Sequence, residues 1–118
     1  MSTIPVLVVL AAAVGVGLYN QREWWGGRRR MGLIAAHLLL GVGGAEALVG
    51  VLHGSDLADG DPLRHTAKLA LLMLGAAVFT GFGAPLLRKS GFATLALAAH
   101  VGAGLAGFFL VLTLGARL

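Results

Sequence analysis

Four long apolar runs fill most of this 118-residue chain, and they limit the folds that it can adopt. A helix needs roughly 20 apolar residues to cross the hydrocarbon core of a bilayer. The runs cover residues 4–25, 31–52, 62–84 and 90–114, and only short connections remain between them. The sequence therefore predicts an all-α integral membrane protein. We expect residues 1–118 to form a single four-helix transmembrane domain, with no soluble catalytic domain.

Composition supports this prediction and limits the kinds of metal site that the chain can form. The chain is 58% hydrophobic and 12% charged, whereas a soluble domain is about 45–50% apolar and about 25% charged. Cysteine is absent, which excludes disulfides, thiolate zinc sites, cysteine-held iron–sulfur clusters and covalent c-type haem. A bound metal would therefore depend on histidine, on carboxylate or on the ligands of its own cofactor.

The charged residues predict the orientation of the helices. Basic residues gather in the first and third connections: Arg22, Arg28, Arg29, Arg30, Arg88 and Lys89. The second connection instead holds Asp56, Asp59 and Asp61, of which Asp61 precedes Pro62 and is expected to cap the third helix. By the positive-inside rule, the first and third connections lie in the cytoplasm and both termini lie outside.

We therefore expect an up-down-up-down bundle in a bacterial inner membrane, in contact with lipid and not with nucleic acid. The first run lacks the basic segment that begins a secretory signal peptide, so we interpret it as a membrane span.

A short phrase containing histidine occurs in both the second and the fourth run. The phrase is Ala-Ala-His-x3-Gly-x2-Gly. Its histidine and glycines are His37, Gly41 and Gly44 in the second run, and His100, Gly104 and Gly107 in the fourth. The two runs point in the same direction, and the two histidines lie at similar depth. The first and third runs share little beyond hydrophobicity, so any repeat of a helical hairpin is supported only locally.

Two imidazoles at one depth suit the two axial positions of a haem iron. At about 100° per residue, the glycines four and seven positions after each histidine return to its face of the helix. Gly41, Gly44, Gly104 and Gly107 are therefore expected to leave clearance for a flat macrocycle. Two other interpretations stay open. Each histidine could hold the magnesium of its own chlorophyll-type pigment, or both could be packing residues that bind no cofactor.

This pattern resembles, at the level of architecture, small b-type cytochromes and the haem-bearing membrane anchors of respiratory enzymes. The resemblance rests on the two His-x3-Gly-x2-Gly phrases. It implies that His37 and His100 ligate haem b and that the chain carries electrons to or from a quinone.

A second polar cluster is predicted near the outer ends of the second and third runs. Glu46 and Lys68 have opposite charges at similar depth, and His53 and His65 stand close by in sequence. One interpretation is a quinone or proton-transfer site. The other is a buried Glu46–Lys68 ion pair that fixes the two helices, beside histidines that contact water.

We expect no stand-alone enzyme, because no serine or threonine within a span pairs with a histidine and a carboxylate. The main functional prediction is an electron-transfer subunit of a membrane redox complex. The alternative is a structural or accessory subunit of a respiratory or photosynthetic complex, packed against other transmembrane subunits through its small residues.

Overall fold

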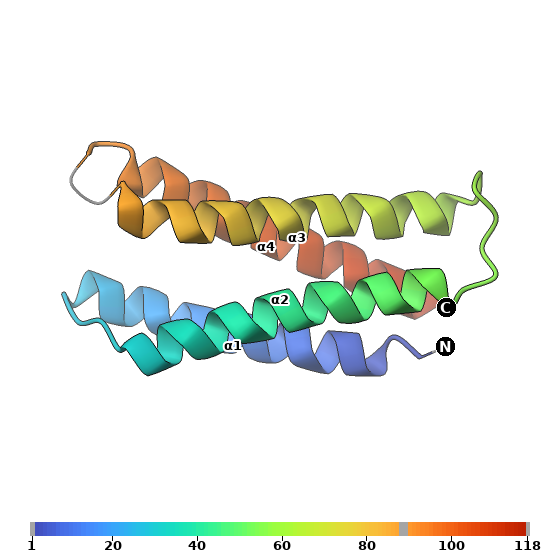
Figure 1. The fold of residues 1–118 in the computed structure, drawn as a ribbon, viewed down its shortest axis with the longest axis horizontal. Coiled ribbons are helices and arrows are strands. Elements are labelled where there is room, and N and C mark those ends of the chain that lie inside the picture. The colour runs from blue at the N-terminus through green and yellow to red at the C-terminus, as the bar shows by residue number, and fades with distance from the viewer. Residues whose placement is uncertain (1, 88–89, 118) are drawn as a thin grey trace.

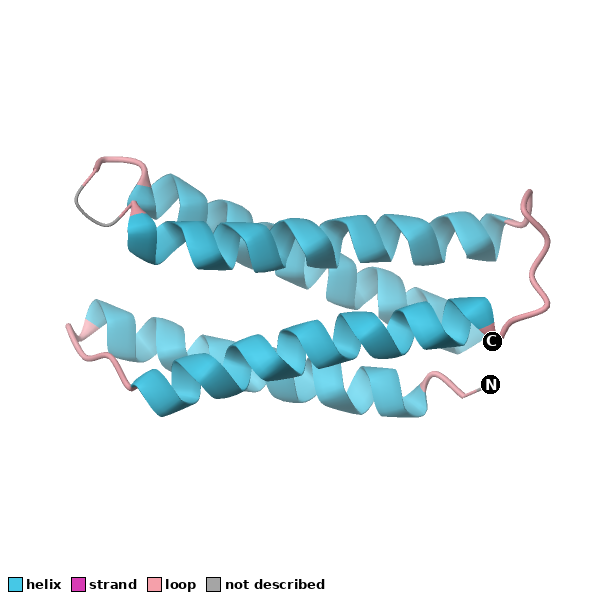
Figure 2. Cartoon of the chain, viewed as in Figure 1, coloured by secondary structure: helices cyan, strands magenta, loops and turns pink. Residues whose placement is uncertain are grey.

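The chain forms four α-helices in the computed structural model, which describes residues 2–87 and 90–117 (Figures 1 and 2). They are α1 (Ile4–Trp25), α2 (Met31–His53), α3 (Pro62–Leu86) and α4 (Ala93–Arg117). Each helix is long and apolar enough to cross a membrane. The longest dimension of the bundle, 46 Å, is close to the ~40–45 Å of a bilayer with its headgroups. The predicted all-α membrane architecture is confirmed.

The helix ends follow local chemistry. Asp61 caps α3 as predicted, since its Oδ1 accepts a hydrogen bond of 2.8 Å from the Leu63 amide. α3 extends two residues beyond the predicted end, because Pro85 is accommodated in its last turn. α4 begins at Ala93 rather than at Ser90, whose amide donates to the Leu87 carbonyl (2.8 Å) within the connecting turn. The predicted basic residues Arg88 and Lys89 lie outside the described residues.

Successive helices run in opposite directions (Figure 1). Both termini and the α2–α3 connection lie at one end of the bundle, here called the terminal end, and the other two connections lie at the opposite end. We call α1–α2 the first hairpin and α3–α4 the second hairpin. Figure 1 shows α4 approaching the first hairpin at the terminal end, while the two hairpins lie further apart at the opposite end.

The buried core occupies the terminal half of the bundle. Its side chains come from the start of α1 and α3 and from the end of α2 and α4: Val6, Leu10, Leu48, Val51, Ala67, Ala70, Leu74, Val111 and Leu114. Between the level of His37 and His100 and the opposite end, Ala84 is the one buried hydrophobic residue among those described. Close packing therefore joins the hairpins at the terminal end and leaves them less tightly joined elsewhere.

The core also reveals a repeat that relates the two hairpins. Fourteen of the buried residues form pairs at a constant sequence offset, 64 between α1 and α3 and 63 between α2 and α4: Thr3 and Ala67, Val6 and Ala70, Leu10 and Leu74, Ala13 and Ala77, Gly44 and Gly107, Leu48 and Val111, and Val51 and Leu114. The prediction that the first and third spans share little is therefore wrong. Their buried faces correspond, although most of their lipid-facing residues differ.

Candidate functional site

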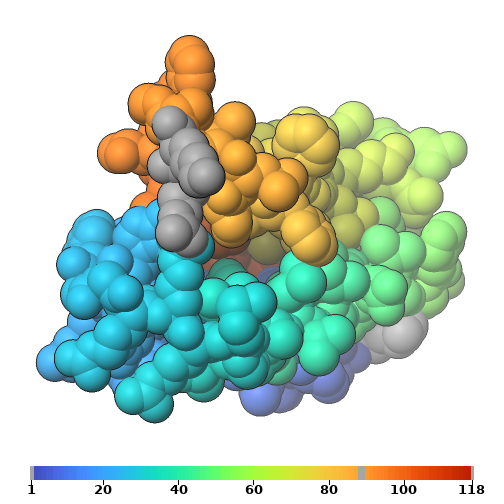
Figure 3. Space-filling view, turned by 60° about the vertical axis from the view of Figure 1, so that its left-hand side comes forward, coloured from blue at the N-terminus to red at the C-terminus, as the bar shows by residue number. Residues whose placement is uncertain are grey.

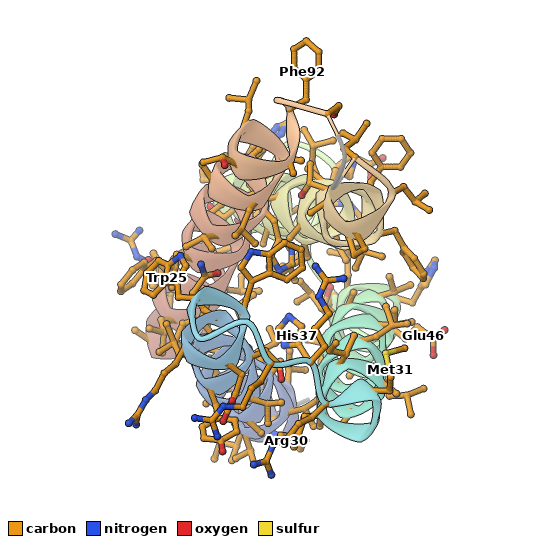
Figure 4. The ribbon with its side chains drawn as sticks, turned by 90° about the vertical axis from the view of Figure 1, so that its left-hand side faces the viewer. Trp25, Arg30, Met31, His37, Glu46 and Phe92 are labelled. Atoms are coloured by element: carbon orange, nitrogen blue, oxygen red, sulfur yellow. The ribbon has the colours of Figure 1, made fainter. Side chains whose placement is uncertain are left out.

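His37 of α2 and His100 of α4 face each other inside the bundle. His37 is six residues after Met31, and His100 is seven after Ala93, so both lie about 9–10 Å from the start of their helices. Their Nε2 atoms are 3.5 Å apart. The ring centroids are 5.7 Å apart and the ring planes are nearly perpendicular, at 84°. Figure 4 shows His37 pointing into the space between the helices. The two imidazoles therefore face one space, as predicted.

Each imidazole is oriented by the other helix of its own hairpin. Nδ1 of His37 lies 2.8 Å from the Ala13 carbonyl oxygen on α1, and Nδ1 of His100 lies 2.6 Å from the Ala77 carbonyl oxygen on α3. A carbonyl oxygen only accepts hydrogen bonds, so both Nδ1 atoms carry the proton and donate it. This is the contact that fixes the tautomer and orientation of a metal-binding histidine.

The tautomers leave the two Nε2 atoms without a proton between them. A neutral imidazole protonated at Nδ1 has a lone pair at Nε2, so two lone pairs face each other across 3.5 Å. An added proton would join them, at the cost of a cation inside an apolar bundle. A metal centre could accept both lone pairs without that cost if its own macrocycle carries the compensating negative charge. The arrangement is therefore chemically suited to a Lewis acid bound between the rings.

Glycine provides the room for both rings. A Cβ on Gly17 of α1 would lie 2.7 Å from Cε1 of His37, and a Cβ on Gly81 of α3 would lie 2.9 Å from Cε1 of His100. Both distances are shorter than real side chains show. Gly17 and Gly81 were missed by the sequence analysis. The signal that finds them is Ala-Ala-Val-x2-Gly, which ends at Gly17 in α1 and at Gly81 in α3.

The four glycines predicted from the histidine phrase have different surroundings. The space beside Gly44 is filled by Leu10 of α1, and the space beside Gly107 is filled by Leu74 of α3. These two glycines allow close packing within each hairpin, so the prediction that they provide clearance for a macrocycle is wrong.

The other two leave more room beside them. A Cβ on Gly41 would meet no atom within 4 Å, and one on Gly104 would meet only the Cβ of Ala77, at 3.7 Å. Clearance at Gly41 and Gly104 stays a prediction.

The donor set suits a metal that brings its own equatorial ligands. Two metal–imidazole bonds of ~2.0 Å in line would place the Nε2 atoms about 4 Å apart, against the 3.5 Å in the structure. A movement of roughly 0.5 Å between the two hairpins, which are less tightly joined at this level than at the terminal end, would bring the Nε2 atoms to that spacing. Among the described residues, no group of three or more His, Asp or Glu side chains could hold a metal ion. A macrocycle would supply the ligands that the protein does not.

The end of the bundle nearer the histidines is basic. An open recess there is lined by Tyr19, Arg22, Glu23, Gly26, Arg28 and Arg30. Arg28 forms an ion pair with Glu23 at 3.5 Å, and the Arg29 guanidinium lies 4.1 Å from the centre of the Trp24 ring. Figure 3 shows the surface hollowed between α2 and α3 toward this end. Positive charge is therefore available close to the level of the imidazoles.

The predicted outer polar cluster is not formed. Glu46, His53, His65 and Lys68 are all exposed, and the ion pairs between described residues, Arg28–Glu23 and Arg64–Asp59, include none of them. The reason is rotation about the helix axis. Glu46 comes two residues after Gly44, which packs against α1, so it lies on the opposite side of α2, and Figure 4 shows it pointing away from the bundle.

Lys68 comes nine residues before Ala77 and is turned about 180° from this α4-facing position. The small cavity nearby is apolar, lined by Leu48, Val51, Leu52, Ser55, Leu57, Ala67 and Leu114. The predicted buried Glu46–Lys68 pair is wrong, and so is the predicted pocket with these four residues on its walls.

Comparison with known proteins assigns no family. No protein-family model matches the chain, and neither a curated protein nor a solved structure matches it.

Proposed function

We propose that this chain is a small integral membrane protein that holds one b-type haem between His37 and His100 and carries electrons within a membrane redox complex. The observation that carries the proposal is the pair of Nε2 atoms, 3.5 Å apart, on imidazoles whose Nδ1 atoms both donate to backbone carbonyls. Haem supplies one-electron chemistry when bound, and the protein supplies its axial ligands and its surroundings.

Each half of the molecule would hold the haem through one histidine, positioned in the same way. In the first hairpin, the Ala13 carbonyl orients His37 and Gly17 leaves room for its ring. In the second hairpin, Ala77 and Gly81 do the same for His100. The core joins the hairpins mainly at the terminal end, so the packing between them is looser on the side of the rings that faces the opposite end.

The basic recess suits the carboxylates of a haem. Haem b carries two propionate groups, which need cations or water near the membrane surface. Arg22 lies five residues after Gly17, and Arg30 precedes α2 by one residue, so both stand about two turns or less beyond the imidazole level. Of the arginines that line the recess, Arg28 is already paired with Glu23. Arg22 and Arg30 are therefore the residues that we assign to the propionates.

The facing imidazoles favour a shared haem over two pigments. Two chlorophyll-type pigments, each held by one histidine, would need the rings to face different spaces. Here the two Nε2 atoms point to the same one. A cofactor-free structural role would leave the facing lone pairs to be joined by an extra proton.

The test is a reduced-minus-oxidised absorption spectrum of the purified protein, with haem quantified per chain. We expect one haem per chain and the sharp α-band of a six-coordinate b-type haem, both lost in His37→Ala and in His100→Ala. The matched controls are His53→Ala and His65→Ala, which change exposed histidines and should keep the band. A protein that takes up no haem when supplied with it, or a His37→Ala/His100→Ala double variant that binds haem normally, would overturn the proposal. A long-wavelength band would instead indicate a chlorophyll-type pigment.

A further inference from the structure

Two charged residues lie on the lipid-facing side of the helices, with no partner among the residues that the structure describes. Glu46 on α2 and Lys68 on α3 are both exposed, and neither belongs to an ion pair or hydrogen bond within the described part of the chain. A charge inside a transmembrane helix is costly and normally faces a partner or water. The nearby Arg64 is already paired with Asp59 of the α2–α3 connection, at 3.3 Å. Glu46 and Lys68 therefore call for a partner outside the chain.

The two charges share one face and one depth. Glu46 points away from α1, and Lys68 is turned away from α4, so both lie on the side of the bundle formed by α2 and α3. Glu46 is seven residues before His53 at the end of α2, and Lys68 is six residues after Pro62 at the start of α3. Both therefore lie about 9–10 Å from the terminal end of the helices.

The repeat shows that these charges are a departure from an apolar pattern. The residue of α4 that corresponds to Glu46 is Phe109, and the residue of α1 that corresponds to Lys68 is Ile4. Both are apolar and exposed, at 61% and 67%, as expected of side chains that face lipid. One side of the bundle thus has the surface of a lipid-facing protein, and the other carries an acid and a base at the same level.

We propose that the α2–α3 face binds the same face of a second copy of this chain, through two reciprocal Glu46–Lys68 ion pairs. In a two-fold dimer whose axis is normal to the membrane, α2 of one copy lies opposite α3 of the other. Each Glu46 then meets the Lys68 of its neighbour at equal depth. A second copy is the occupant that the observations favour, because the chain itself supplies both charges of a self-complementary surface. This proposal does not depend on the haem.

Charge exchange between copies provides the test. Two differently tagged forms of the full chain are co-expressed and extracted in lipid nanodiscs, and the fraction captured as dimer is measured. We expect the unaltered chains to co-purify. Glu46→Lys alone places two cations on the face, and Lys68→Glu alone places two anions there, so each should reduce its own dimer by about tenfold or more. Co-expression of the two single variants should restore dimer to near the unaltered level, because each chain then offers the charges that the other lacks.

This result separates pairing between copies from pairing within a copy, since an internal pair cannot be repaired by a second chain. The matched control is Phe109→Lys, which places a charge at the corresponding level of the opposite face and should leave the dimer intact. Helical content by circular dichroism verifies folding, and Glu46→Gln with Lys68→Gln, which only remove charge, should weaken the dimer less than reversal does. A monomeric unaltered chain would overturn the proposal and leave the face to a different protein. Single variants that dimerise normally, or that fail to associate with each other, would overturn it as well.

Discussion

Alanine at Gly17 or Gly81 tests how the histidines are held without touching them. A Cβ on Gly17 would lie 2.7 Å from Cε1 of His37, against 3.4 Å for ordinary contact, so the ring must move by about 0.7 Å. The corresponding shift for Gly81 is about 0.5 Å, from a distance of 2.9 Å. Either shift disturbs the hydrogen bond from Nδ1 to the backbone carbonyl, which is 2.8 Å for His37 and 2.6 Å for His100.

The size of the effect follows from this contact. Loss of a group that orients a metal-binding histidine typically lowers metal affinity by about 10–100-fold, or ~1.4–2.8 kcal/mol. We therefore expect Gly17→Ala and Gly81→Ala to weaken haem binding by that factor, measured by titrating the haem-free protein with haem in detergent micelles. The controls are Gly15→Ala on α1 and Gly83→Ala on α3, where a Cβ meets no atom within 4 Å. If all four variants bind haem equally well, the assigned roles of Gly17 and Gly81 are refuted.

Three further predictions concern packing, capping and charge. Gly107→Ala should destabilise the fold by ~1–3 kcal/mol, measured by thermal unfolding, because its Cβ would lie 2.8 Å from Leu74 Cδ2. The control is Gly102→Ala, which should change stability little because the space beside Gly102 is open. Asp61→Ala removes the cap on the Leu63 amide and should cost ~0.5–2 kcal/mol in the same assay, with Asp56→Ala as the exposed control; equal stability of both variants would contradict the capping role. Arg22→Gln with Arg30→Gln should weaken haem retention by about 2–30-fold, since each exposed ion pair contributes ~0.2–1 kcal/mol; a similar loss from Arg117→Gln would argue against a specific role in the recess.

The sequence predicts the helices well because their signal is local. Length and apolar composition identify all four spans, and Asp61-Pro62 marks the start of α3. The ends were less predictable, because Pro85 lacks one backbone N–H donor but does not end α3, which continues to Leu86. Equal depth on parallel helices allows His37 and His100 to meet. The rotation of α2 and α4 that turns the two rings toward each other is seen only in the structure.

The errors at the site arise from the rotation of each helix about its axis. Glu46 and Lys68 have matching depth, but depth does not say which side of a helix faces its neighbour. Composition also does not predict which side chain packs against a glycine. Leu10 and Leu74 pack against Gly44 and Gly107, whereas the imidazoles of His37 and His100 pack against Gly17 and Gly81. A comparison of α1 with α3 at a fixed offset identifies the second pair of glycines, because the buried faces repeat.

The most direct measurement is the electron paramagnetic resonance spectrum of the oxidised, haem-loaded protein. Coordination by both imidazoles predicts a low-spin ferric signal, and His37→Ala or His100→Ala alone should each convert it to a high-spin signal or abolish haem binding. The near-perpendicular rings, at 84°, further predict a strongly anisotropic low-spin spectrum. A high-spin signal in the unaltered protein, or a low-spin signal that survives the loss of either histidine, would contradict the claim that His37 and His100 share one iron.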